Sequence, residues 1–555
     1  MIVDSSVRSP VWIITHACAL GRCARGRYSV NLRLITSMQP SLISADRLAK
    51  ILEQFLADTP QAIAVEDGQV LFDFQTARYS VSGEGKCILH IWSEDRNTVR
   101  RVLDAAVKGR TLRLSVVRFG QAQPSQLEVC AERDRRTGTL KRLLRAQYQR
   151  LLERVLRREY PGFKVEHLSI SPDLEHSFSP VYTRAVLRAG QSAFAVLGVN
   201  GEETQSSVDA ALSFGILWMD YQRQHLAGRA HVEGLKLFLP PGRSEIVRQR
   251  AAHLNAEAAK WQIFELEERS EICEPRDSAD SGNIMTRLTR AVDGHAARER
   301  FAASVARIHA LAPAAEITVE SASEVVFRLY GLVFARARIT PVSGSFRNAE
   351  SISFGIGPAE YVLDESNESR FRELLQRITE HRRPGGSHTN LFFRLAPERW
   401  LETLITRDVR AIDERLDGRF VYSQVPAFTA ADRAMLDVLT CTLDGRLAVL
   451  ELKADEDIHL PLQGLDYWAR VRWHQQRGEF ARYGYFAGRE LSSAPPLLFL
   501  VAPALRVHPA TDVLLRYLSP QIEWTLVQVD ERWRHGVRVV HKKHPQGILT
   551  TDLHR

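Results

Sequence analysis

The feature that most constrains this 555-residue chain is a pair of apolar runs joined by an Asp-Gly turn. Positions 435 to 467 read MLDVLTCTLDGRLAVLELKADEDIHLPLQGLDY. Runs rich in Val, Leu and Thr on both sides of Asp444-Gly445 predict a β-hairpin. Because strand side chains alternate between two faces, Glu451 and Lys453 are expected to project from the same face. The hairpin therefore places charged groups within an apolar setting.

The length of the turn decides whether Asp437, on the first run, meets Glu451 on the second. A two-residue loop would point Asp437 away from Glu451. A three-residue loop over 443–445, with Gly445 in the left-handed conformation of a G1 bulge, would place the two acids directly opposite each other. We expect the three-residue loop.

Two carboxylates and a lysine on one hairpin face suit metal-assisted hydrolysis of a phosphodiester. Mg²⁺ is commonly held by one or two carboxylates together with waters and substrate oxygens. The bound ion neutralises the phosphate and lowers the pKa of a water. Asp437 and Glu451 would hold the ion, and Lys453 would orient or deprotonate the attacking water. Lys453 is the only lysine between Lys260 and Lys542. The scarcity of lysine argues against a chance placement of Lys453 two residues after Glu451.

The combination of Asp437, Glu451-Leu452-Lys453 and Gln463-x-x-x-Tyr467 resembles the PD-(D/E)XK nuclease superfamily, and its last element resembles the RecB-type branch. Met435-Leu436 stands where the superfamily pattern has proline. The sequence of 397–503 is also similar to that of an uncharacterised bacterial family that carries this domain. The surrounding sequence predicts the α-β-β-β-α-β order of a restriction-endonuclease-like core, in the following elements: helix 397–409, strand 421–428, the hairpin, a helix from 461, strand 497–501, helix 510–518 and strand 522–529.

The resemblance implies a set of site residues and partners. It implies Asp437, Glu451, Lys453 and Gln463 as catalytic residues, and Asp437, Glu451 and the backbone oxygen of Leu452 as ligands of Mg²⁺ or Mn²⁺. It also implies supporting roles for Glu402 and Tyr467, and contacts of Arg470 and Arg472 with nucleic acid. We expect an endonuclease acting on nucleic acid, with DNA favoured over RNA. The sequence has no Gly-x-x-x-x-Gly-Lys-Ser/Thr motif, so an ATPase or helicase would be a separate partner.

Composition places the chain among ordinary globular proteins, at 45% hydrophobic and 25% charged residues. A net charge of +8 and a pI near 9.2 permit an acidic partner without requiring one. No apolar run reaches the roughly 20 residues of a membrane span. The six cysteines are scattered and suggest reduced thiols in a cytoplasmic protein.

The fold class expected from the whole sequence is α/β (α+β with mixed sheets), in several domains. Residues 1–37 do not match the rest and read as a non-native or disordered leader. Five ordered matches, offset by about 250 residues, suggest an internal duplication. A charged helix is expected at 94–102 in the first half and at 367–378 in the second. The expected divisions are an accessory module at 44–140, a degenerate nuclease-like domain at 141–265, a linker at 266–300, a second accessory module at 301–390 and the nuclease domain at 391–548.

The first copy is expected to be catalytically inert. In the alignment, Gly198 takes the position of Glu451 and Asn200 that of Lys453. Alternatively, 148–240 is an unrelated α/β domain, which would be equally devoid of catalytic residues. Two functions from different classes therefore stay open: an active metal-dependent nuclease, and a non-catalytic nucleic-acid-binding or assembly protein that keeps the fold.

Overall fold

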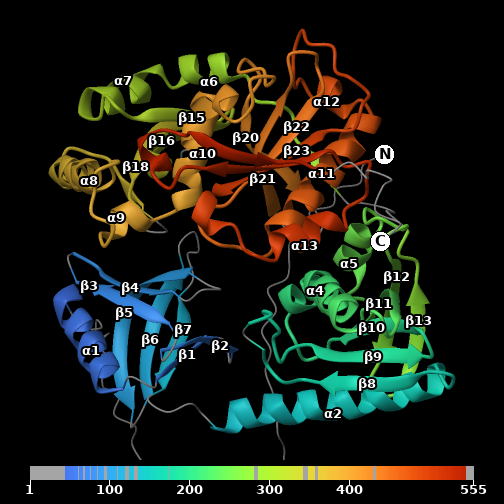
Figure 1. The fold of residues 1–555 in the computed structure, drawn as a ribbon. Helices are drawn as coiled ribbons and strands as arrows, with labels where there is room; N and C mark the ends of the chain where they lie inside the picture. The colour runs from blue at the N-terminus through green and yellow to red at the C-terminus, as the bar shows by residue number, and fades with distance from the viewer. Residues whose placement is uncertain are drawn as a thin grey trace, which may run out of the picture. The chain divides into compact units, whose positions relative to one another are not determined.

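The computed structural model describes residues 44–545, apart from gaps at 60–61, 67–68, 75–76, 84, 93–96, 109–110, 119–123, 131–134, 174, 280–285, 342–347, 357–359 and 429–432. The predicted leader, 1–37, lies outside the described residues. The described chain is a mixed α/β protein of several domains with four β-sheets (Figure 1).

The first accessory module is an antiparallel half-barrel. Its strands lie in the order β2-β1-β7-β6-β5-β4-β3, and α1 packs on β3, β4 and β5 through the buried Leu48, Leu52 and Leu56. The bounds are α1 Ala45–Asp58, β1 Ile63–Glu66, β2 Gln69–Asp73, β3 Arg78–Ser82, β4 Cys87–Trp92, β5 Asn97–Lys108, β6 Thr111–Arg118 and β7 Ser125–Cys130.

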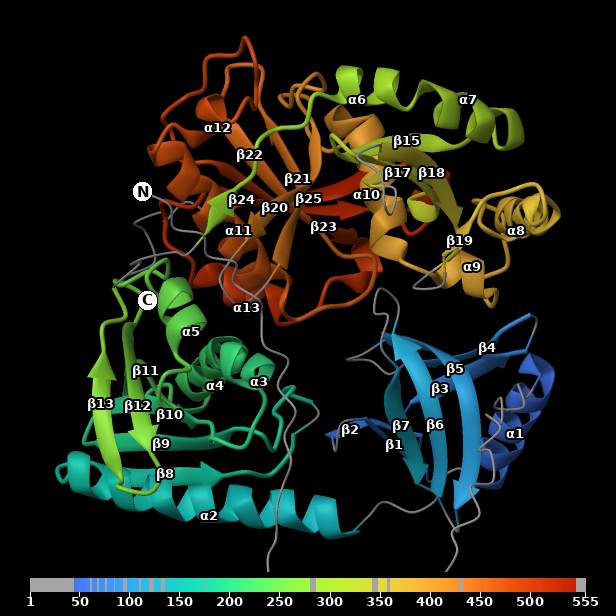
Figure 2. The ribbon, with the colours of Figure 1, turned by 180° about the vertical axis from the view of Figure 1, so that it is seen from behind.

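The first α/β domain is built on a six-stranded mixed sheet in the order β13-β12-β11-β10-β9-β8. Helix α2 packs on β8 and β9, while α4 packs on β10 and β11 (Figure 2). The bounds are α2 Arg135–Glu159, β8 Lys164–Ser169, β9 Thr183–Ala189, β10 Ser192–Gly198, α3 Gln205–Asp209, α4 Ala211–His225, β11 His231–Leu239, α5 Glu245–Ala251, β12 Lys260–Glu267 and β13 Ile272–Arg276.

The second accessory module is a five-stranded antiparallel meander, β15-β16-β17-β18-β19, with helices before and after it. The bounds are α6 Gly294–Arg300, α7 Ala302–Leu311, β15 Glu316–Ser321, β16 Glu324–Leu329, β17 Leu332–Pro341, β18 Asn348–Phe354, β19 Tyr361–Val362, α8 Glu368–His381 and α9 Leu391–Arg394.

The second α/β domain is built on a seven-stranded mixed sheet in the order β14-β20-β21-β22-β23-β24-β25. The bounds are β14 Arg287–Leu288, α10 Pro397–Arg407, η1 Val409–Ala411, β20 Tyr422–Phe428, β21 Arg433–Cys441, β22 Leu447–Leu452, α11 Leu460–Gln476, α12 Glu479–Arg482, β23 Leu497–Pro503, η2 Ala504–Arg506, α13 Thr511–Arg516, β24 Trp524–Val529, η3 Trp533–His535 and β25 Val539–Lys543.

The two α/β domains share one topology. In each, three antiparallel strands lead through a helix to a strand that pairs in parallel with the third, and a further helix and two strands complete the sheet. Thus β8 to β13 correspond in order to β20 to β25, α2 to α10, α4 to α11 and α5 to α13. The α-β-β-β-α-β order predicted for the C-terminal part is confirmed.

Two predictions about the connecting regions are wrong. The helix predicted at 94–102 is strand β5 from residue 97 onward, and 94–96 lie outside the described residues. Strands β4 and β6 pair with the two edges of β5, and its β-branched residues suit a sheet. The predicted linker 266–300 contains ordered structure, since Ile272–Arg276 forms β13 at the edge of the first α/β sheet. The helix predicted at 367–378 is confirmed as α8.

A single hydrophobic core extends across the two α/β domains. It includes Leu217 and Leu237 from the first domain and Leu465, Leu500 and Leu515 from the second, all buried. A separate core lies beneath α10 on the opposite face of the second sheet. Helix α11 therefore lies between its own sheet and the first α/β domain.

No helix in the described part of the chain is long and apolar enough to cross a membrane. Among the cysteines of the described ranges, Cys87, Cys273 and Cys441 are free thiols.

Candidate active site

The β21–β22 hairpin has the three-residue loop predicted from the sequence. Thr442 N–H donates to the carbonyl of Arg446 at 2.7 Å, and Gly445 N–H donates to the carbonyl of Thr442 at 2.9 Å. Gly445 has φ of 87°. Val438 pairs with Leu450 in the ladder. The register prediction is confirmed.

This register brings the two predicted acids together. Asp437 stands opposite Glu451, and its Oδ2 accepts a hydrogen bond from Leu452 N–H at 3.0 Å. Glu451 is 1% exposed, and its Oε2 is buried without a hydrogen-bond partner. Leaving a charged oxygen buried and unpartnered costs free energy. The site therefore has an unfilled requirement for a donor or a cation at Glu451.

The electrostatics of Glu451 agree with that requirement. Burial first, and then the charge of Asp437, raise the pKa of Glu451 well above its usual range, although Lys453 acts in the opposite direction. Two acids in this position repel each other when both are ionised. A cation between them would favour the ionised pair.

Lys453 supplies the positive charge of the site. Its Nζ lies 3.4 Å from Glu451 Oε1 and 3.4 Å from Asp457 Oδ2. Burial opposes the ammonium form, but the neighbouring charges of Glu451, Asp457 and Asp437 outweigh burial and raise the pKa of Lys453. Asp457, which is not among the residues predicted from the sequence, lies beside Lys453 in the structure.

Helix α11 brings Gln463 and Tyr467 to the same face. The helix packs closely on the sheet at Gly464, where a Cβ would lie 2.4 Å from Cδ2 of Leu500 and in contact with the Cβ of Glu451 at 3.6 Å. Gln463 Nε2 is 3.5 Å from the hydroxyl of Tyr467. Burial, followed by the charge of Glu451, raises the pKa of Tyr467 to about 12. The phenol therefore stays protonated and can donate a hydrogen bond toward the acids.

Helix α10 contributes two further acids. Glu402 is 3% exposed; its Oε2 accepts from Arg399 at 2.8 Å and from Gln424 at 3.0 Å, while its Oε1 is buried without a partner. Burial is the main cause that raises the pKa values of both Glu402 and Glu398, and the charge of Asp437 adds to it. Sequence reasoning missed Glu398. Its signal was the four-residue spacing from Glu402, which puts both on one helix face.

The two arginines predicted to contact nucleic acid do not lie together. Arg470 is 7% exposed, with its guanidinium 5.8 Å from the ring of Tyr467. Arg472 instead donates to Gln475 Oε1 at 2.9 Å and to the carbonyl of Ser493 at 2.8 Å. Residues two apart on a helix point in different directions, which explains the separation. The predicted contact of Arg470 with nucleic acid stays a prediction.

The donor set determines what ion the site could hold. Across the ranges that the structure describes, no three His, Cys, Asp or Glu side chains are arranged as a metal-binding group. Asp437 and Glu451, with the backbone oxygen of Leu452, fit instead the Mg²⁺ pattern of few protein ligands completed by waters and substrate. The buried, unpartnered oxygen of Glu451 supports that fit.

The first α/β domain has different residues at the topologically equivalent positions. A Cβ at Gly215 of α4 would collide with two leucines of β11, as a Cβ at Gly464 of α11 would with two leucines of β23. These glycines therefore mark equivalent points of the two folds. The leucines are Leu235 and Leu237 in the first domain, and Leu498 and Leu500 in the second.

Strand pairing carries the correspondence to the site. Leu237 pairs with Leu197, just as Leu500 pairs with Glu451. Leu197 therefore stands at the position of Glu451. Arg184, which pairs with Leu197, stands at that of Asp437.

Aromatic packing fills the remaining positions. Counting from the equivalent glycines, Phe214 corresponds to Gln463 and Trp218 to Tyr467. The guanidinium of Arg184 lies 4.6 Å from the ring of Phe178 and 5.4 Å from that of Trp218. The equivalent of the acidic cluster is thus an arginine among aromatic rings.

The predicted alignment of Gly198 with Glu451 and of Asn200 with Lys453 is wrong by one residue. The first domain's hairpin has a two-residue loop, since Ala189 pairs with Ser192, and the second has three. A shift of one residue moves a side chain to the other sheet face. Gly198 in fact faces α2, where its Cβ would lie 2.7 Å from the hydroxyl of Tyr148. The expectation that this domain lacks the acids does not depend on that alignment.

Comparison of the chain with models of protein families, with curated proteins and with solved structures found no match.

Proposed function

We propose that the chain is a metal-dependent nuclease that hydrolyses phosphodiester bonds of nucleic acid, with DNA favoured and an endonuclease mode. The observation that carries the proposal is the pairing of Asp437 with Glu451, whose buried Oε2 has no partner, beside Lys453 Nζ. The proposal includes a restriction-endonuclease-like core of the PD-(D/E)XK type for the second α/β domain. It also includes descent of the first α/β domain from the same fold by duplication.

The residues divide the work by their chemistry. Asp437, Glu451 and the backbone oxygen of Leu452 would hold Mg²⁺ or Mn²⁺. When bound, the ion supplies charge neutralisation and lowers the pKa of a water. Lys453 Nζ carries three donors and a positive charge next to Glu451, which suits it to orient a water and to balance charge on a phosphate. Gln463 and Tyr467 provide donors from α11, and Glu402 supports the acidic cluster from α10.

A second function comes from a different class: a nucleic-acid-binding or assembly protein that keeps the fold without cleavage. The absence of the acids from the first domain agrees with this function as well. A cluster of four buried or half-buried acids favours the nuclease. Burial of carboxyl groups costs free energy of folding, and groups with raised pKa values cluster at functional sites. The four are Glu398, Glu402, Asp437 and Glu451.

The test is cleavage of single-stranded, duplex and branched DNA and RNA with Mg²⁺ or Mn²⁺, and with chelator. Glu451→Gln should abolish cleavage and barely change the fold, because it removes a charge from the ion site. Lys453→Ala should leave ion binding largely intact and slow cleavage by about 10²–10⁴-fold or more, the range of general acid–base assistance. Gln463→Ala should be milder, because the amide positions rather than ionises.

Glu456→Gln is the matched control, since Glu456 is an exposed acid five residues beyond Glu451. It should cut at the wild-type rate. If Glu451→Gln and Lys453→Ala also cut at that rate, this site is not catalytic. Ion binding by the wild type without cleavage of any substrate would favour the binding or assembly function.

A further inference from the structure

The two α/β domains pack through equivalent elements in exchanged positions. Helix α4 of the first domain contacts α13 of the second, and α5 of the first contacts α11 of the second. Because α4 corresponds to α11 and α5 to α13, each contact is the counterpart of the other. This exchange is the pattern of an isologous interface, which a homodimer forms about a two-fold axis.

The backbone marks the centre of this arrangement. Leu254, after α5, forms an antiparallel bridge with Leu518, after α13. Asn255 N–H donates to the carbonyl of Tyr517 and Ser519 N–H to that of His253, each at 2.9 Å. Equivalent segments thus meet each other, as they would on a two-fold axis.

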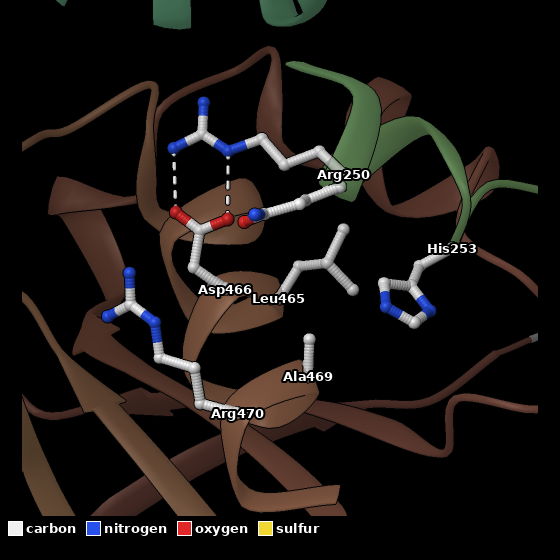
Figure 3. Close-up of a pocket in the computed structure, with 7 residues that line it drawn as sticks. Arg250, His253, Leu465, Asp466, Ala469 and Arg470 are labelled. Atoms are coloured by element: carbon white, nitrogen blue, oxygen red, sulfur yellow. Dashed lines mark hydrogen bonds and ion pairs between the residues drawn. The ribbon is translucent and has the colours of Figure 1, made fainter. Parts of the chain in front are cut away.

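Each half of the interface has its own polar contact. In the α5–α11 half, Arg250 Nε and Nη2 donate to the two carboxylate oxygens of Asp466 at 2.9 and 2.7 Å (Figure 3). In the α4–α13 half, Asp220 Oδ1 accepts from the hydroxyl of Tyr517 at 2.9 Å and from Arg516 at 3.2 Å. Arg250 and Asp466 of the first contact and Asp220 of the second are all largely buried. Only the first contact touches α11, the helix that carries Gln463 and Tyr467.

The Arg250 contact is fixed from both ends. Arg250 Nη1 donates to the carbonyl of Asp209 at 2.6 Å, which holds the guanidinium in its own domain. The cavity beside Asp466 and Arg470 measures about 10 Å³, about the volume that one water needs. A planar guanidinium bonded to both oxygens of a carboxylate sets orientation as well as distance. Asp466 directly precedes Tyr467 and follows Gln463 by three residues.

A second contact from the first domain lies at the start of α11. The ring of Phe214 is 6.2 Å from that of His459, in an edge-to-face arrangement. His459 immediately precedes α11 and its carbonyl accepts from Gln463 N–H at 2.9 Å. The first domain therefore contacts α11 both at its start and beside Tyr467.

We propose that the first α/β domain is the positioning partner of α11, with Arg250 as the positioning residue that fixes Gln463 and Tyr467 against the acids through Asp466. The inference rests on the proposed nuclease function. The inert domain contributes no reacting group. It contributes a rigid surface at α5, and contacts with that surface hold α11 of the second domain in position.

The experiment compares Arg250→Ala with Asp220→Ala in the full chain. Both remove a largely buried polar contact from the same interface, so both should lower the melting temperature. Only Arg250→Ala should lower kcat, by up to about 10²-fold, because misplacement of about 1 Å costs that much. The affinity for Mn²⁺ should not change. Arg250→Lys should recover only part of the loss, since an ammonium cannot reproduce the bidentate contact.

A readout that does not need cleavage is amide hydrogen exchange along 460–470. Exchange there should accelerate in Arg250→Ala and stay near wild type in Asp220→Ala. Equal acceleration in both variants, or none in either, overturns the positioning role. If the wild type cuts nothing, the nuclease function fails while the exchange result still decides whether Arg250 positions α11.

Discussion

At the scale of single residues, one buried carboxylate connects the segment after α10 to the last strand. Asp413 accepts hydrogen bonds from Arg415 at 2.8 Å and from Lys542 of β25 at 3.0 Å. Burial favours the neutral acid, but these bonds outweigh it and lower the pKa of Asp413 to about 2. A carboxylate with a lowered pKa in the folded state stabilises the fold when it is ionised.

We expect Asp413→Asn to lower the free energy of unfolding at pH 7 by about 2 kcal/mol, from 1.36 kcal/mol per pKa unit. The folded pKa lies below the unfolded value, so this stabilisation is complete above about pH 4 and is lost as the pH falls toward 2. Urea unfolding of both proteins between pH 7 and pH 3 measures the difference. Glu153→Gln, at an exposed helical ion pair, is the control and should change little. A gap that stays constant over this range would contradict the assignment.

Residue patterns predicted more of the site than of its surroundings. Asp437, Glu451 and Lys453 could be placed on one face from strand alternation and the Gly445 turn alone, because those rules are local. Glu398 and Asp457 join the same group. The four-residue spacing from Glu402 places Glu398 on the same helix face as Glu402, but no local rule brings that face, or Asp457, to the hairpin. Their proximity follows from how α10 and the loop after β22 pack, which depends on the complete sheet.

At the scale of elements, the hairpin turns differ in what their glycines contact. Gly445, in the β21–β22 turn, has positive φ, and a Cβ there would lie 2.2 Å from the carbonyl oxygen of Glu490. Gly190, in the equivalent β9–β10 turn, also has positive φ but no atom within 4 Å of such a Cβ. The two positions share the conformational requirement and differ in steric room.

We expect Gly190→Ala to cost about 1–2 kcal/mol, the price of a left-handed backbone with a side chain. Gly445→Ala should cost more, because the backbone of Glu490 must also move. It should also reduce cleavage, because the turn sets the register of Asp437 and Glu451. Urea unfolding and cleavage assays on both variants test this. Equal costs, or normal cleavage by Gly445→Ala, would count against the proposed link between turn and site.

The element boundaries of the second α/β domain follow its sequence closely, since α10 begins at Pro397 and β23 is a continuous apolar run. The boundaries and register of the first α/β domain follow less directly from its sequence. Its hairpin is shorter by one residue, and apolar strands align with each other in either register. The sequence of strand β5 is rich in charged residues and predicts a helix. Its extended conformation depends on pairing with β4 and β6, which its own sequence does not record.

At the scale of the whole molecule, the order of helices and strands along the chain could be inferred for the second α/β domain, but the interface between the two domains could not. The exchange of α4–α13 with α5–α11 depends on surfaces that are far apart in sequence, such as Arg250 and Asp466. No periodicity records such a pairing. It becomes visible only when the two folds are compared in space.

The two-fold relation between unequal halves has a consequence for counting. Two strands of a duplex are themselves related by local two-fold axes, so a dimer of identical nuclease subunits offers one reactive centre to each strand. Under the proposed function, the described part of this chain offers one such centre. We expect each molecule to bind Mn²⁺ at one catalytic site and to break one strand per encounter. Supercoiled plasmid should therefore accumulate as nicked circles before any linear form appears, which agarose gels resolve. Linear DNA formed directly, without the nicked intermediate, would mean that two chains act together.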